Sequence, residues 1–106
     1  MPNCIFCKIV NGEIAKDFAW QTELVVAFDD INPVASTHIL ILPKEHFGTF
    51  LDIKNTHDKI LVEMVSVAQK LIREKKIEDG FKLVFNGGRY QHVPHLHWHL
   101  LGGGGV

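Results

Sequence analysis

Apolar residues along this chain fall into short compact runs and one long helical repeat. Residues 23–28 and 37–42 are rich in aliphatic and β-branched side chains, which predicts two buried strands. Pro43 ends the second of these runs. Residues 81–85 and 95–101 predict two further strands near the end of the chain.

Between the two pairs of strands, apolar residues recur at the spacing of an amphipathic helix. Asn55 or Thr56 is expected to cap this helix, and Gly80 lies just beyond its end. A short helix is also expected over residues 4–10. One long helix among strands joined by short links predicts an α+β fold with a largely antiparallel sheet. The apolar stripe of the long helix consists of Leu61, Met64, Val65, Ala68, Leu71 and Ile72.

Length and charge narrow the class of protein. The chain has 106 residues, which suits a single domain over residues 1–106. Eleven basic and 12 acidic residues give a net charge of -1, which excludes a broad basic surface for long nucleic acid. No apolar run is long enough to span a membrane. The first residues lack a secretory signal, and Cys4 and Cys7 are too close to join distant elements, so a cytoplasmic location is expected.

Seven histidines are many for so short a chain, and three of them alternate near its end. His95, His97 and His99 would share one face of a strand, at intervals of roughly 6–7 Å. Leu96, Trp98 and Leu100 would share the other face and pack on the core. A helix would scatter the three imidazoles around its axis, so the spacing favours a strand that carries them together.

Imidazole is also the commonest neutral metal ligand, so a catalytic metal centre is an alternative for these histidines. Such a centre needs a further ligand from elsewhere in the chain. His38, His46 or His92 could supply it. The residues alone leave both interpretations open.

The pattern His-φ-His-φ-His-φ-φ, where φ is apolar, resembles the signature of the histidine triad (HIT) family. Residues 4–9, 28–33, 37–46 and 84–88 resemble further blocks of that family in the same order and spacing. The nearest branch is that of the small nucleoside phosphoramidases. The resemblance implies a sheet of about five strands with one long and one short helix, paired in a homodimer through the long helix and a neighbouring strand.

The same resemblance assigns catalytic roles. It makes His97 a nucleophile that attacks phosphorus and forms a nucleotidyl-histidine. His95 and His99 would hydrogen-bond the phosphoryl oxygens or orient the groups that do so. His38 would orient His97 from a neighbouring strand, and Asn86 would contact the substrate near the phosphate.

For the nucleoside, the resemblance implies that Asp30 accepts hydrogen bonds from the ribose hydroxyls. Phe6, Ile14 and Phe28 would enclose a purine base, and His92 would affect the leaving group. Taken alone, Asp30 also suits a turn before Asn32-Pro33, and the apolar residues also suit an ordinary core.

Some relatives bind structural zinc, and the matching residues here are Cys4, Cys7, His46 and His95. Together they would complete a tetrahedral site. The alternative is a pair of reduced thiols with no ligand. The chemistry implied for His97 requires no metal.

The implied activity is hydrolysis of a purine nucleoside phosphoramidate or a related nucleotidyl conjugate, which releases a nucleoside monophosphate. A dinucleoside polyphosphate hydrolase, or a nucleotide-binding regulatory protein with little turnover, is the alternative. The chain departs from the family at three points that affect substrate choice. The segment between Asn86 and His95 is about two residues shorter, His92 replaces a serine or glutamate, and residues 102–106 stand where relatives have a basic residue and a longer tail.

Overall fold

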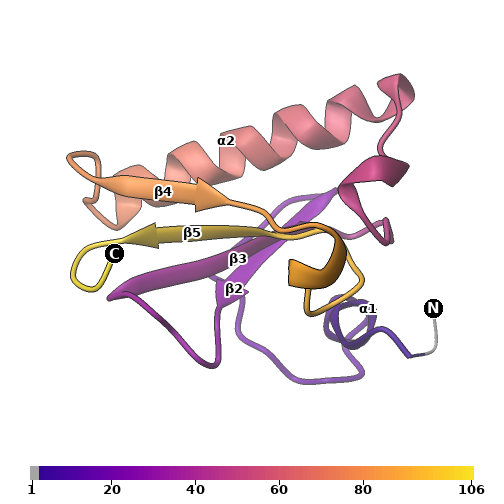
Figure 1. Cartoon of the computed structure of the whole chain (residues 1–106), viewed down its shortest axis with the longest axis horizontal. Helices are drawn as coiled ribbons and strands as arrows, with labels where there is room; N and C mark the ends of the chain where they lie inside the picture. The colour runs from indigo at the N-terminus through magenta and orange to yellow at the C-terminus, as the bar shows by residue number, and fades with distance from the viewer. Residues whose placement is uncertain (1–2) are drawn as a thin grey trace.

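A computed structural model describes residues 3–106, so the first two residues of the expected domain lie outside it. Five strands form one sheet in the order β1-β2-β3-β5-β4, and every neighbouring pair is antiparallel (Figure 1). The predicted α+β fold with a largely antiparallel sheet is therefore confirmed. The strands are β1 (Trp20–Gln21), β2 (Val25–Asp29), β3 (Thr37–Pro43), β4 (Phe81–Val84) and β5 (Trp98–Gly102).

Two α-helices cover opposite faces of the sheet (Figure 1). The short helix α1 (Ile5–Val10) begins after Cys4, whose Sγ accepts a hydrogen bond from the backbone N–H of Cys7. The long helix α2 (Asp58–Glu74) begins later than expected, because a 3₁₀ turn occupies Asn55–His57. In that turn, Nδ1 of His57 accepts a hydrogen bond from the backbone N–H of Lys54.

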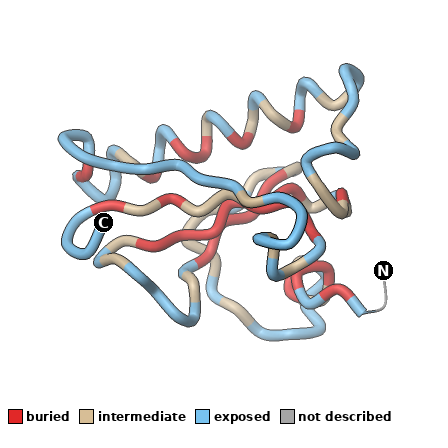
Figure 2. The backbone as a smooth tube through the Cα atoms, viewed as in Figure 1, coloured by how far each residue is buried: buried red, intermediate tan, exposed pale blue. Residues whose placement is uncertain are grey.

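The alternation of side chains along β3 divides the interior into two apolar clusters. Ile39 and Ile41 face α2, together with Leu100 of β5. Leu40 and Leu42 face the opposite way and pack with α1 and β2. Because both faces of β3 are covered, nearly the whole strand is buried, as Figure 2 shows by its red tube.

The last strand is shorter than expected. It begins at Trp98 and not at residue 95, because His95 lies in a bend after Pro94. The backbone N–H of Leu96 donates to the carbonyl of Phe47, which lies outside the sheet, so this residue cannot join the ladder. Within the strand the expected alternation holds, because Trp98 and Leu100 pack on the α2 side and His99 pairs with Leu40 on the other.

Strand β4 forms one edge of the sheet and is exposed along its whole length. Strand β1 forms the other edge; with two residues, it is too short to give a periodic pattern, and the sequence did not predict it. In residues 3–106, no helix is long and apolar enough to cross a membrane.

Candidate active site

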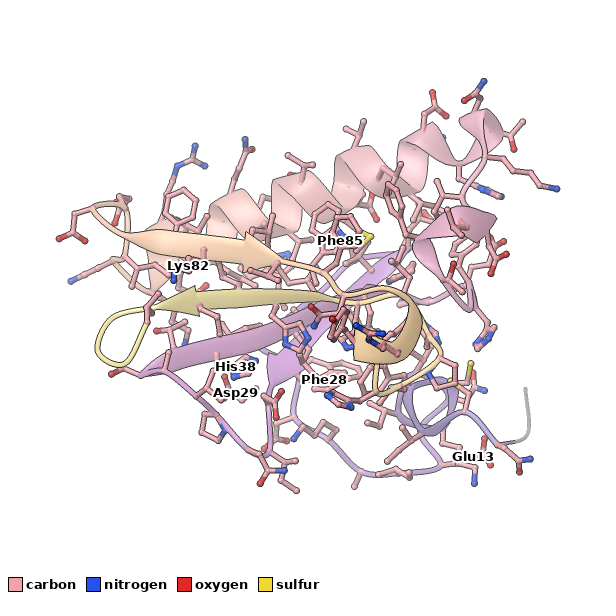
Figure 3. All side chains as sticks on the ribbon, viewed as in Figure 1. Glu13, Phe28, Asp29, His38, Lys82 and Phe85 are labelled. Atoms are coloured by element: carbon pink, nitrogen blue, oxygen red, sulfur yellow. The ribbon has the colours of Figure 1, made fainter. Side chains whose placement is uncertain are left out.

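A pocket of about 660 Å³ opens on the side of the sheet that carries α1. This volume is within the range of pockets that enclose small molecules. Figure 3 labels Phe28 and Asp29 of β2 and His38 of β3, which line this pocket. The wall is apolar around α1 and β2, and imidazoles gather where β3 and β5 meet. The lining includes Ile5, Phe6, Ile9, Ile14, Lys16, Phe28, Asp30, Asn32, His38, His92, Val93, His97 and His99.

The ring of His97 has a defined orientation. Its Nδ1 lies 2.7 Å from the carbonyl oxygen of His95. A carbonyl only accepts hydrogen bonds, so Nδ1 carries the proton of the neutral ring. The other nitrogen, Nε2, keeps its lone pair. His97 is therefore held in the tautomer that a nucleophile requires.

His99 is held in the opposite tautomer by His38. The backbone N–H of Val34 donates to Nδ1 of His38 over 3.1 Å, so the proton of the neutral His38 ring lies on Nε2. That Nε2 lies 3.0 Å from Nδ1 of His99 and 3.3 Å from Oδ2 of Asp30. Because Nδ1 of His99 accepts this bond, its Nε2 carries the proton and can donate to an oxygen of a ligand.

These contacts correct one expected role. The sequence predicted that His38 orients His97, but Nε2 of His38 bonds to His99. The backbone carbonyl of His95 orients His97. The prediction was wrong because β5 begins at Trp98. His99 therefore lies in the strand that pairs with β3, whereas His97 lies before it.

Burial favours the uncharged form of the triad imidazoles. It lowers the pKa of His97, although the hydrogen bond to the His95 carbonyl and the nearby Asp30 oppose this. Burial also lowers the pKa of His99, and the neighbouring His97 and His38 add to the effect. Both rings are therefore largely neutral at pH 7.

A second cluster lies beside the pocket, where α1 meets the segment before β5. The ligating atoms of Cys4, Cys7, His46 and His95 all lie within 4.8 Å of one another. Nε2 of His95 donates to the carbonyl of Pro43 over 2.8 Å, so its Nδ1 has a free lone pair. This nitrogen lies 3.4 Å from Sγ of Cys4 and 3.6 Å from Sγ of Cys7.

The chemistry of this cluster suits zinc. Two thiols and two imidazoles are a common tetrahedral donor set for Zn²⁺. Burial lowers the pKa of His95 to about 4, which keeps its ring neutral as a ligand must be. Burial and the neighbouring Cys4 raise the pKa of the Cys7 thiol, so a bound cation would have to displace its proton. The sequence-predicted ligands fit the metal.

The residues expected to bind substrate divide into two groups. Phe6, Ile14, Phe28, Asp30 and His92 line the pocket. Asn86 follows β4 and is absent from the lining of the pocket.

The ring of His95 faces the cysteines, so it is not positioned to touch a phosphate in the pocket. The three rings of the triad are nevertheless on one side of the sheet. The ring of Phe6 lies 5.9 Å from that of His95 and 5.1 Å from that of His97, centroid to centroid, and the ring of His99 lies 5.0 Å from that of His97.

Several residues of the lining were missed by the sequence, among them Lys16 and Val93. Lys16 follows α1 in a segment without periodic pattern, and its neighbours gave no signal that its ammonium would lie 5.5 Å from the ring centroid of Phe28. Val34, whose backbone N–H holds His38, was missed as well. A backbone donor leaves no trace in the residue type.

The chain is similar to known proteins over nearly its whole length. The family model described as "Scavenger mRNA decapping enzyme C-term binding" matches residues 3–104. The chain is 45% identical over 102 residues to a protein named purine nucleoside phosphoramidase from Escherichia coli, which covers 93% of this chain and 86% of that protein. It is 42% identical over 103 residues to a 14 kDa zinc-binding protein from Zea mays, which covers 93% of this chain and 80% of that protein.

Solved structures are also similar. A HIT family hydrolase from Clostridium thermocellum superposes with a TM-score of 0.92 at 40% identity, over 97% of this chain and 92% of that one. A histidine triad protein from Clostridium difficile superposes with a TM-score of 0.93 at 39% identity, over 100% of this chain and 95% of that one. The chain belongs to the histidine triad family.

Proposed function

We propose that this protein is a nucleotide hydrolase that cleaves purine nucleoside phosphoramidates or related nucleotidyl conjugates. The observation that carries the proposal is the Nδ1–H of His97 bonded to the His95 carbonyl, since it leaves Nε2 as a nucleophile beside a pocket of nucleotide size. The identity of 45% to a protein named purine nucleoside phosphoramidase supports the substrate class.

In the proposed reaction, Nε2 of His97 attacks the α-phosphorus while the bond from phosphorus to the leaving amine breaks. The amine departs with a proton, which His92 can supply because it is exposed and lines the same pocket. Water then attacks the phosphorus and gives a proton to His92, which restores the proton that His92 supplied, while the bond to His97 breaks and a nucleoside monophosphate is released. The Nε2–H of His99 stabilises the charge that develops on the phosphoryl oxygens.

The remaining residues bind the nucleoside. Oδ1 of Asp30 accepts a hydrogen bond from the backbone N–H of Asn32, which holds the carboxylate at the pocket for the ribose hydroxyls. Phe6 and Phe28 meet edge to face at 5.7 Å and form an apolar wall for a purine. A dinucleoside polyphosphate would react through the same histidine, so it is the alternative substrate.

The direct test is hydrolysis of fluorogenic adenosine and guanosine phosphoramidates by the wild type and by His97→Ala. We expect turnover to fall by at least about a thousandfold, and a nucleotidyl adduct on His97 to be trapped in the wild type. His57→Ala, a substitution at a histidine outside the pocket, is the matched control and should keep its activity. If wild type and His97→Ala were equally inactive while both bound AMP, the nucleotide-binding regulatory protein would become the better interpretation.

We also propose that Cys4, Cys7, His46 and His95 hold a structural zinc ion. The donor set, its burial and the lone pair on Nδ1 of His95 support the assignment. When bound, zinc would join α1 to the segment that precedes β5. In residues 3–106 both cysteines are free thiols, which is consistent with the cytoplasmic location that we propose.

Finally, we propose that two copies pair through β4 and α2. The edge strand exposes Phe81, Leu83 and Val84, and α2 exposes Val62 and Val65 beside it. An apolar, unpaired edge is a ready template for a second sheet. The chain has a mass of 12.0 kDa, so light scattering should give about twice this value for the wild type. Val62→Asp with Val84→Asp should give the monomer mass, and a monomeric wild type would contradict the proposal.

A further inference from the structure

The pocket has two chemically different ends. Imidazoles of β3 and β5 form one end, where the proposed function places the phosphate. The contacts then continue from His97 to Phe6 at 5.1 Å, and from Phe6 to Phe28 at 5.7 Å. The ammonium of Lys16 lies 5.5 Å from the centroid of the Phe28 ring. This order puts Lys16 at the end where the base would lie.

Lys16 is half-buried at this position. Among the described residues that line the pocket, it is the one lysine or arginine. No carboxylate in residues 3–106 forms an ion pair with it. Its ammonium therefore has hydrogen atoms available for a ligand, and its partial desolvation increases the value of an acceptor there.

An ammonium donates hydrogen bonds and accepts none. Guanine and hypoxanthine present two adjacent acceptors, O6 and N7, to such a donor, whereas adenine presents N7 beside an amino group that itself donates. Asn32 also lines the pocket, but its amide both donates and accepts, so it does not favour either kind of base.

We propose that Lys16 reads the O6/N7 edge of the base and makes the pocket selective for 6-oxopurine nucleotides over adenine nucleotides. The inference rests on the proposed function for the placement of the phosphate and the base. It adds a specificity-determining residue that lies outside the histidines and the apolar wall. A good contact of this kind discriminates between bases by roughly five- to tenfold at a partly exposed site.

The test measures the dissociation constants of GMP, IMP and AMP by calorimetry. The wild type should bind GMP and IMP roughly five- to tenfold more tightly than AMP. IMP lacks the 2-amino group of guanine, so it isolates the O6/N7 edge. Lys16→Met should reduce the preference to within about twofold, and Lys16→Arg should retain it because guanidinium also donates twice to this edge.

Lys70→Met is the matched control, because Lys70 also lies over an aromatic ring, that of Trp20 at 5.3 Å, but outside the pocket. This variant should keep the wild-type preference. Equal binding of the three nucleotides by the wild type, a preference for GMP without one for IMP, or a preference that survives in Lys16→Met would each overturn the proposal. If the preference follows Lys16 while no phosphoramidate is hydrolysed, the proposed activity fails and the assignment of Lys16 stands.

Discussion

Two clusters of potential metal ligands lie on the same side of the sheet, and each contains two histidines. Cys4, Cys7, His46 and His95 form one, and Asp30, His38 and His99 form the other; in each, the ligating atoms lie within 4.8 Å of one another. They differ in the backbone group that bonds to one histidine of each cluster, His95 in the first and His38 in the second.

In the first cluster, the Pro43 carbonyl takes the Nε2–H of His95 and leaves the lone pair of Nδ1 facing the two sulfurs. In the second, the Val34 N–H takes the lone pair of His38 Nδ1 and leaves the Nε2–H facing Asp30 and His99. A metal cannot bind a nitrogen that carries a proton. A backbone acceptor therefore prepares a histidine to bind a cation, and a backbone donor prepares it to give a proton.

The largest effect is expected from breaking the first cluster. Cys7→Ser should reduce the zinc content from about one ion per chain to none, and lower the free energy of unfolding by about 3–5 kcal/mol, because a bound metal stabilises only the folded chain. Elemental analysis and denaturant titration measure the two quantities. His99→Asn, in the other cluster, should leave the zinc content unchanged. Full zinc binding by Cys7→Ser would show that Cys7 is not a ligand.

A smaller effect is expected from breaking the second cluster. His38→Ala removes the Nε2–H that fixes the tautomer of His99, so kcat should fall by about a hundredfold while KM changes little. The zinc content should remain that of the wild type. His46→Ala should give the reverse pattern, with zinc lost and the hydrogen bond between His38 and His99 intact. A loss of zinc in His38→Ala would mean that the two clusters are not independent.

The third prediction needs no substitution, because it measures the tautomers of the wild-type histidines directly. Nitrogen chemical shifts of the imidazoles at pH 7.5 should identify His97 as the Nδ1–H form and His38, His95 and His99 as the Nε2–H form. Detection of His97 as the Nε2–H form would contradict its assignment as the nucleophile.

Most of the fold follows from short-range patterns in the sequence. The apolar runs of β2 and β3 were predicted within a few residues, because a run of apolar residues is typical of a strand buried on both faces. The stripe of α2 was predicted in part: Met64, Ala68 and Leu71 are buried. Val65, expected in the stripe, is exposed, and the helix buries Ile60 and Val67 instead. The start of β5 was not predictable in this way. It depends on the carbonyl of Phe47, which is far from Leu96 in the sequence and takes its N–H away from the sheet.

The site was predictable in its residues and less so in its contacts. The alternating histidines and the cysteine pair identified most of the groups that the structure brings together. The predicted partner of His38 was wrong, because the sequence pattern alone leaves both His97 and His99 as candidates. Only the pairing of β3 with β5, which includes His99 and not His97, distinguishes them. Lys16 lies outside every motif, and its position depends on the course of the loop after α1.

The order of the strands in space has a consequence for how the protein is made. Strand β5 lies between β3 and β4, yet it follows all the other strands in the chain. During translation, β3 and β4 therefore leave the ribosome before β5, and the edges that pair with β5 stay unpaired until it has been synthesised. His99 arrives with that strand, so a nascent chain cannot assemble the pocket before synthesis has passed residue 102. A prematurely terminated chain would expose two apolar edges to chaperones and proteases and would lack the triad.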